Sequence, residues 1–156
     1  MSEERSAPTV PSGLVLAHLG RRALGAVLDQ FLVLVPVAIG IVVVGYRLGD
    51  ELDDGDLLLL NAVAVAVTFA YQTVMIGSLG RTVGKIATGT RVVSVIHGGS
   101  IGWFGATQRA LVPALAAAVP SLGIALGSVV YGLAFFGSLR QGLHDRAAGS
   151  VVVMAG

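Results

Sequence analysis

Three long apolar stretches dominate the pattern of hydrophobic and polar positions. They cover residues 23–45, 57–79 and 110–139. The first two hold 23 residues each. As a helix, each would measure about 34 Å, enough to cross a hydrocarbon core of about 30 Å. The first stretch contains one charged residue, Asp29, and the second contains none. We therefore predict two transmembrane helices.

The third stretch is 30 residues long, which is too long for an ordinary single span, and it contains Pro113 and Pro120. The segment from Pro120 to Gly123 is a credible break, since proline disfavours a helical residue before it and glycine permits a turn. A single span and a hairpin both remain open. We prefer a hairpin of two short helices over residues 100–119 and 124–139.

Two short segments are rich in β-branched residues, and they cover residues 91–96 and 150–154. Such runs next to turn residues predict strands, which could pair on one membrane face. The predicted fold is thus an all-α membrane protein. It has two transmembrane helices plus a helical hairpin, about four helices, with short β strands at the cytoplasmic face. We expect a disordered tail over residues 1–13 and one transmembrane domain over 14–154.

Composition supports a lipid-embedded protein. Hydrophobic residues make up 54% of the chain and charged residues 12%, whereas soluble domains carry about 25% charged residues. The lipid bilayer is therefore the expected partner. A net charge of +1 gives no reason to expect that the protein binds nucleic acid. The absence of cysteine excludes disulfides and thiolate metal sites. We expect no cofactor and no metal.

Loop charges predict the orientation. Residues 46–56 carry one arginine against five acids, whereas residues 80–109 carry four basic residues and no acid. Basic residues concentrate on the cytoplasmic side of a membrane. The 80–109 segment should therefore be cytoplasmic and the acidic loop external. Arg22 and Arg140 then place both termini in the cytoplasm, which requires an even number of crossings. We therefore expect a multi-pass protein of the cell membrane.

Asp29 is the leading candidate for a functional residue. A carboxylate at membrane depth costs roughly 2.5–3.5 kcal/mol on insertion scales, so it normally has a partner. Arg22 precedes it by seven residues, which leaves the two about 20° apart around a helix. Gly25 lies on the same face and suits close approach by another helix. A structural ion pair with an arginine and an ion-handling role both remain open for Asp29.

A polar stripe of Asn61, Thr68 and Gln72 falls on one face of the second helix. Such residues usually form hydrogen bonds between helices, although they could also hydrate a route through the membrane. No Ser–His–Asp, metal-ligand or paired-carboxylate arrangement stands out, so we do not expect an enzyme.

Three segments resemble the RDD family of small membrane proteins. Residues 20–22 read GRR and are followed by Asp29, residues 80–85 read GRTVGK, and residues 140–150 read RQGLHDRAAGS. The arginine and two aspartates for which the family is named match Arg22, Asp29 and Asp145, and Arg109 matches a further common arginine. The resemblance covers residues 14–153. It implies a bacterial-type integral membrane protein, and some relatives have been linked to cation/proton exchange.

A transport hypothesis follows from this resemblance: the protein would be a cation/proton exchanger or a transporter of another small solute. It places a charge cluster near the cytoplasmic side, made of Arg22, Asp29, Arg109, Arg140, His144 and Asp145. Asp29 would exchange its arginine partner for a small cation or a proton, and His144 would tune proton access because histidine titrates near neutrality. Four short helices scarcely enclose a pathway, so transport would require a homo-oligomer. The alternative is a non-catalytic membrane scaffold or accessory subunit in which the cluster is purely structural.

Overall fold

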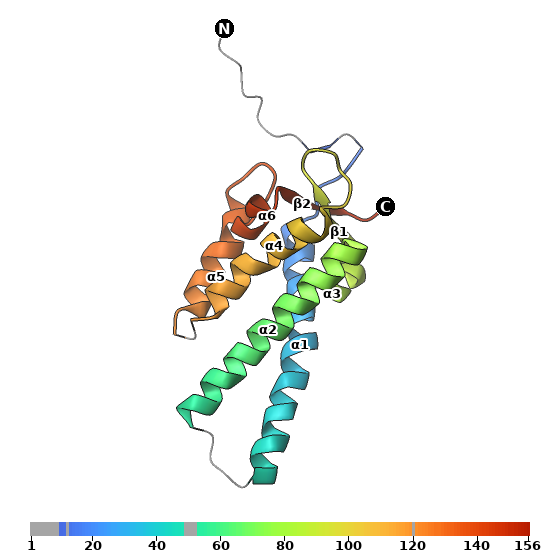
Figure 1. Cartoon of the computed structure of the whole chain (residues 1–156). Coiled ribbons are helices and arrows are strands. Elements are labelled where there is room, and N and C mark those ends of the chain that lie inside the picture. Colours follow the sequence, from blue (N-terminus) through green and yellow to red (C-terminus); the bar gives the residue numbers. More distant parts are fainter. Residues whose placement is uncertain (1–9, 12, 49–52, 120) are drawn as a thin grey trace.

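The computed structural model describes residues 10–11, 13–48, 53–119 and 121–156, and Figure 1 shows how its elements are arranged. Most of the predicted disordered tail lies outside the described residues, because it falls on residues 1–9 and 12. The predicted break residue Pro120 lies outside them as well. The described chain is mostly helical and includes one small sheet.

The two long helices are α1 (Leu19–Leu48) and α2 (Asp54–Leu79). With 30 and 26 residues, they are about 45 and 39 Å long. The segments Leu19–Gly45 and Asp54–Leu79 are long and apolar enough to cross a membrane. Only 11% and 0% of their most apolar windows are buried, which is unlike the core helix of a soluble protein. Both predicted long apolar helices are confirmed.

Local signals set both ends of α2. The Asp53 side chain accepts a hydrogen bond from the Asp56 amide at 2.8 Å, and the Asp56 side chain accepts one from the Asp53 amide at 3.1 Å. This reciprocal capping satisfies two amides that the first helical turn leaves free. At the other end Gly80 has φ +68°, the left-handed conformation that glycine adopts without strain. The chain therefore turns sharply after α2.

The third apolar stretch forms a hairpin of α4 (Gly102–Ala117) and α5 (Gly123–Gly132), followed by the 3₁₀ turn η1 (Leu133–Phe135). The preferred hairpin arrangement is present, but the return helix ends well before residue 139. In Figure 1 the hairpin packs beside α2 and stops short of the far ends of α1 and α2. At the far half of the molecule, the described residues therefore form two helices with exposed apolar side chains, such as Val42 and Leu59.

Two short helices were not predicted, so the described residues contain six α-helices and not about four. They are α3 (Val83–Ala87) and α6 (Leu143–Ala147), with five residues each. Five residues are too few to produce a helical hydrophobic period. Thr82 caps α3, since its hydroxyl accepts a hydrogen bond from the Lys85 amide at 3.4 Å. Both short helices lie at the sheet end of the molecule (Figure 1).

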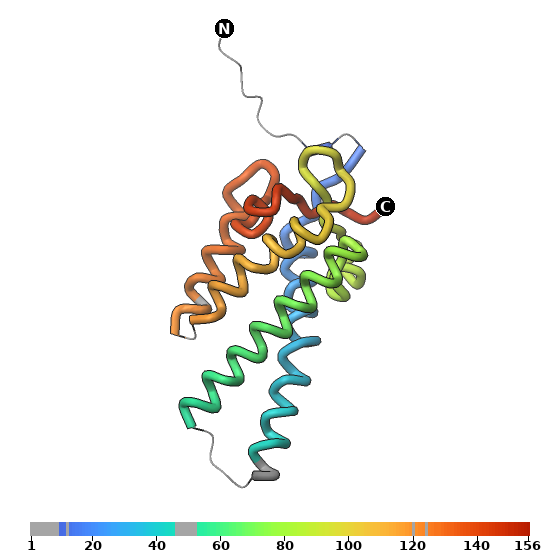
Figure 2. Tube along the Cα trace, viewed as in Figure 1, coloured from blue at the N-terminus to red at the C-terminus, as the bar shows by residue number. Residues whose placement is uncertain are grey.

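The strands β1 (Thr90–Ser94) and β2 (Ser150–Met154) pair antiparallel, with Val92 opposite Val152, which confirms the predicted pairing. An isolated bridge from Leu16 to Val153 brings the segment before α1 to the same sheet. Figure 2 shows these three segments gathered at one end of the bundle. The buried apolar core lies there too, where Val92 and Val152 pack with residues of the helices.

Candidate functional site

The predicted charge cluster forms as two neighbouring groups of side chains, each centred on one aspartate. One surrounds Asp145 and contains Arg22, Arg109, His144 and Ser150; we call it the Asp145 cluster. The other surrounds Asp29 and contains Tyr71, Thr82, Gly84 and Lys85; we call it the Asp29 cluster. The sequence-based expectation of one joint cluster is therefore corrected.

The Asp145 cluster ties three helices and the sheet together. Both carboxylate oxygens of the fully buried Asp145 are paired, one with Arg22 from α1 and the other with Arg109 from α4. The Arg109 guanidinium also donates to the Ser150 hydroxyl at 3.0 Å. Arg140 contributes its backbone carbonyl, which accepts a hydrogen bond from Arg22, while its own guanidinium points to the Ala17 carbonyl 3.4 Å away.

Electrostatics keep this cluster in one charge state. Burial by itself would raise the pKa of Asp145, but the positive charges of Arg109 and Arg22 hold that pKa well below its usual range. Burial also lowers the pKa of His144 to about 3, although the charge of Asp145 opposes this shift. His144 is therefore neutral near pH 7. This shift argues against the expected titration of His144 near neutrality, because an enclosed imidazole loses the hydration that its charged form needs.

The Asp29 cluster joins α1, α2 and α3. One carboxylate oxygen accepts hydrogen bonds from the Tyr71 hydroxyl and the Gly84 amide, both at 2.7 Å. The other accepts from the Thr82 hydroxyl at 2.5 Å and lies 3.8 Å from the Lys85 ammonium. Asp29 is 7% exposed, so these contacts replace almost all of its water.

The charged partner of Asp29 is a lysine, not the arginine that was expected. Seven residues place Arg22 on nearly the same face as Asp29 but about 10.5 Å away along the helix axis. At that level Arg22 meets Asp145, from the other end of the chain. Among the described residues, no arginine lies within salt-bridge distance of Asp29. In the sequence, Lys85 counted as a loop charge and, with Thr82, as part of the GRTVGK segment. Neither of these residues nor Tyr71 was assigned to the site.

A contact between two glycines brings α3 close to Asp29. A Cβ atom on Gly84 would lie 2.0 Å from the Gly25 carbonyl oxygen and 2.9 Å from the Asp29 carboxylate carbon. Any other residue at this position would push α3 away from α1, and the Gly84 amide could not reach Asp29. The expected close approach of another helix at Gly25 is thus observed, and the partner is α3.

The pKa of Lys85 lies in the mildly alkaline range. Burial, reinforced by the nearby charge of Arg109, lowers the pKa of Lys85 to about 8. The carboxylate of Asp29 favours the charged form but does not overcome these effects. Lys85 therefore loses its proton at a pH where an ordinary lysine remains charged.

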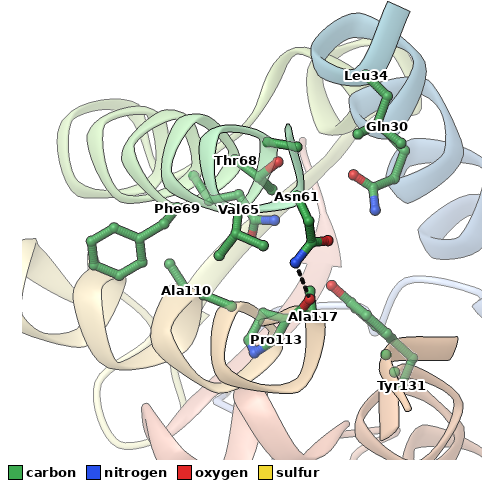
Figure 3. Close-up of a pocket in the computed structure, with 15 residues that line it drawn as sticks. Gln30, Leu34, Asn61, Val65, Thr68, Phe69, Ala110, Pro113, Ala117 and Tyr131 are labelled. Atoms are coloured by element: carbon green, nitrogen blue, oxygen red, sulfur yellow. Dashed lines mark hydrogen bonds between the residues drawn. The ribbon is translucent and has the colours of Figure 1, made fainter. Parts of the chain in front are cut away.

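The predicted polar stripe lines one cavity. This polar cavity has a volume of about 250 Å³ and lies between α1, α2, α4 and α5 (Figure 3). Asn61, Thr68 and Gln72 all line it, together with Gln30 and Tyr131. Asn61 also donates a hydrogen bond to the Ala117 carbonyl at 3.1 Å, so it links α2 to the hairpin as well.

A smaller cavity of about 110 Å³ connects this region to the Asp29 cluster. We call it the Asp29 cavity, because Asp29 and Lys85 form part of its wall. The two cavities have four lining residues in common: Gln30, Thr68, Gln72 and Tyr131. Polar groups thus continue from the Asp29–Lys85 pair toward Asn61, on the far side of the polar cavity. No group of acidic, histidine or cysteine side chains within the described segments is arranged to hold a metal ion.

Comparison with known proteins identifies one family. The family model described as "RDD family" matches residues 16–149, which is most of the chain. No curated protein matches the chain. No solved structure matches it either.

Proposed function

The chain belongs to the RDD family, and on that premise we propose that it is a multi-pass cell-membrane protein that exchanges a small cation for a proton. Family membership together with two apolar helices is consistent with a membrane protein. The observation that carries the transport proposal is the Asp29–Lys85 pair, because it lies on the wall of the Asp29 cavity, which shares polar lining residues with the polar cavity.

The distribution of charge supports a membrane orientation. The end of the molecule that contains the sheet carries Arg22, Lys85 and Arg109. The opposite end, where α2 starts, carries Asp53, Asp54 and Asp56. Basic residues favour the cytoplasmic side. We place the sheet and both chain ends in the cytoplasm, with α1 and α2 crossing the bilayer and the shorter hairpin inserted from the cytoplasmic face.

In the proposed exchange, the ammonium of Lys85 occupies the position of a bound cation. When Lys85 releases its proton toward the cytoplasm, it becomes neutral and no longer balances the Asp29 carboxylate. A small cation then takes its place beside Asp29, so the net charge of the site is unchanged. The lowered pKa of Lys85 makes this release accessible near pH 8. The Asp145 cluster takes no part in this step and holds the helices in place.

The remaining route runs along the polar cavity. After binding from the cytoplasm, the cation would leave Asp29 outward, and Asn61, Thr68 and Gln72 would hydrate it on this route. Beyond the hairpin, α1 and α2 are the only elements of the described residues that continue, and two helices cannot enclose a pathway. We propose that a second copy of the chain covers the outer half and that the working unit is a homo-oligomer.

Flux into proteoliposomes tests this proposal. Purified full-length protein is reconstituted with a pH-sensitive dye inside, and a sodium or potassium gradient is imposed across the membrane. We expect cation-dependent proton movement that Asp29→Asn lowers at least about tenfold. The matched control is Asp54→Asn, an exposed acid at the start of α2, which should keep the activity. Retained exchange in a folded Asp29→Asn protein would refute the assignment.

A scaffold or accessory role is the second candidate, and one observation favours it. Both oxygens of Asp29 already accept hydrogen bonds, so the carboxylate serves as a joint between α1, α2 and α3 without any ion. In this case the wild-type protein would move no cation above protein-free liposomes. Asp29→Asn would then lower only its stability.

A further inference from the structure

A third cavity lies on the other side of Lys85. We call it the basic cavity; its volume is about 290 Å³. Residues of α1, α3, α4, η1 and α6 contribute to its wall. Its charged lining residues are Arg22, Lys85 and Arg109, and none of its lining residues, all within the described part of the chain, is acidic.

The charges around the basic cavity do not balance. Asp145 lies behind Arg22 and Arg109 and neutralises one of them, and Asp29 faces Lys85 from the neighbouring Asp29 cavity. Three cationic side chains against two carboxylates leave one positive charge. The neutral His144 does not alter this sum. A single anion in the cavity would complete the balance beside basic side chains that are themselves largely buried.

Most of the remaining wall is apolar, and Thr90, Tyr131 and His144 are its uncharged polar residues. Leu19, Ala23 and Ala26 contribute from α1, and Ala134 and Phe135 from η1. Phe135 is mostly exposed, so the wall continues onto the outer surface of the helices. A ligand that fits this wall carries an anionic group for the basic side chains and tolerates hydrocarbon beside it.

We propose that the basic cavity binds a phosphate group. Arginine and lysine together suit phosphate oxygens, and basic pockets between membrane helices accept phospholipid headgroups. The same chemistry would accept free phosphate. An anionic lipid would place its headgroup between Arg22 and Lys85 and its acyl chain along Ala23 and Phe135. This site stands independently of the proposed transport, but it shares Lys85 with it. A bound phosphate would therefore draw the ammonium away from Asp29.

Thermal unfolding of the purified full chain in dodecyl maltoside tests the site. The probes are phosphatidylglycerol, phosphatidylcholine with the same acyl chains, and inorganic phosphate. Lys85→Gln removes the one basic side chain of the cavity lining that forms no ion pair with Asp145. Ala23→Trp fills the cavity from an exposed position of α1 without changing any charge. Arg146→Gln is the matched control, because Arg146 is an exposed cation on α6 outside the cavity.

We expect phosphatidylglycerol or inorganic phosphate to raise the unfolding temperature of the wild type more than phosphatidylcholine does. A response to both anions identifies free phosphate as sufficient, and a response to phosphatidylglycerol alone identifies a lipid. The affinity should fall about fivefold in Lys85→Gln, the effect of one lysine near a lipid phosphate. It should be lost in Ala23→Trp and unchanged in Arg146→Gln. Equal shifts with all three probes, no shift, or wild-type affinity in Ala23→Trp would overturn the proposal, whatever the flux assay shows.

Discussion

Replacing Asp145 with asparagine should destabilise the protein severely without touching the proposed transport site. The carboxylate is fully buried and is shared by two guanidinium groups, those of Arg22 and Arg109. Asparagine keeps the shape but removes the charge, and its amide group would face one of the two arginines. Removing one partner of a buried ion pair costs about 3–5 kcal/mol, because the remaining charge stays buried without compensation.

That loss is large compared with the total stability of a domain, which is about 5–15 kcal/mol. Denaturant unfolding in detergent, followed by far-UV circular dichroism, measures it directly. Asp54→Asn is the matched control, since Asp54 is exposed and lies outside the reciprocal cap of α2. It should change the free energy of unfolding by less than about 1 kcal/mol.

The pH dependence provides a second measurement on the same group. The pKa of Asp145 is lower in the folded than in the unfolded protein, so the unfolded state binds the proton more readily. The stabilisation from Asp145 is therefore present above about pH 4 and is lost as the pH falls below that value. A folded Asp145→Asn protein within about 1 kcal/mol of the wild type would contradict the structural role assigned to this cluster.

Three further changes test the Asp29 cluster. Gly84→Ala should lower the free energy of unfolding by at least about 1–3 kcal/mol, because its Cβ would lie 2.0 Å from the Gly25 carbonyl oxygen; Gly20→Ala, with open space around it, should be tolerated in the same denaturant assay. Tyr71→Phe removes a hydrogen bond to a carboxylate and should cost about 1.5–3 kcal/mol, and an unchanged unfolding midpoint would argue against that bond. Because the pKa of Lys85 falls to about 8 in the folded state, the unfolded state binds more protons above that pH. The free energy of unfolding should therefore rise between about pH 8 and pH 10, and Lys85→Gln, compared with wild type at both pH values, should abolish the rise.

Much of the fold could be predicted from the sequence. Two apolar helices, a broken third stretch and two pairing strands were all expected, since each depends on a local run of residues. The polar stripe was also visible, because Asn61, Thr68 and Gln72 repeat with the period of a helix. The lengths of the elements were predicted less well: the return helix ends early, and α3 and α6 are too short to show a period.

The sequence by itself determined which segments are apolar, which segments can pair as strands and that arginines and aspartates take part in a charge cluster, but it did not reveal the buried Lys85. Only the tertiary structure decided which charge meets which. Arg22 and Asp145 are 123 positions apart, and their contact depends on the path of the whole chain. Asp29 contacts Lys85 because Gly25 and Gly84 allow the backbones of α1 and α3 to approach closely. The sequence pattern of a single helix does not predict how near another helix lies. Hydrophobic periodicity is a local property of the chain, whereas the pairing of buried charges depends on how distant segments pack.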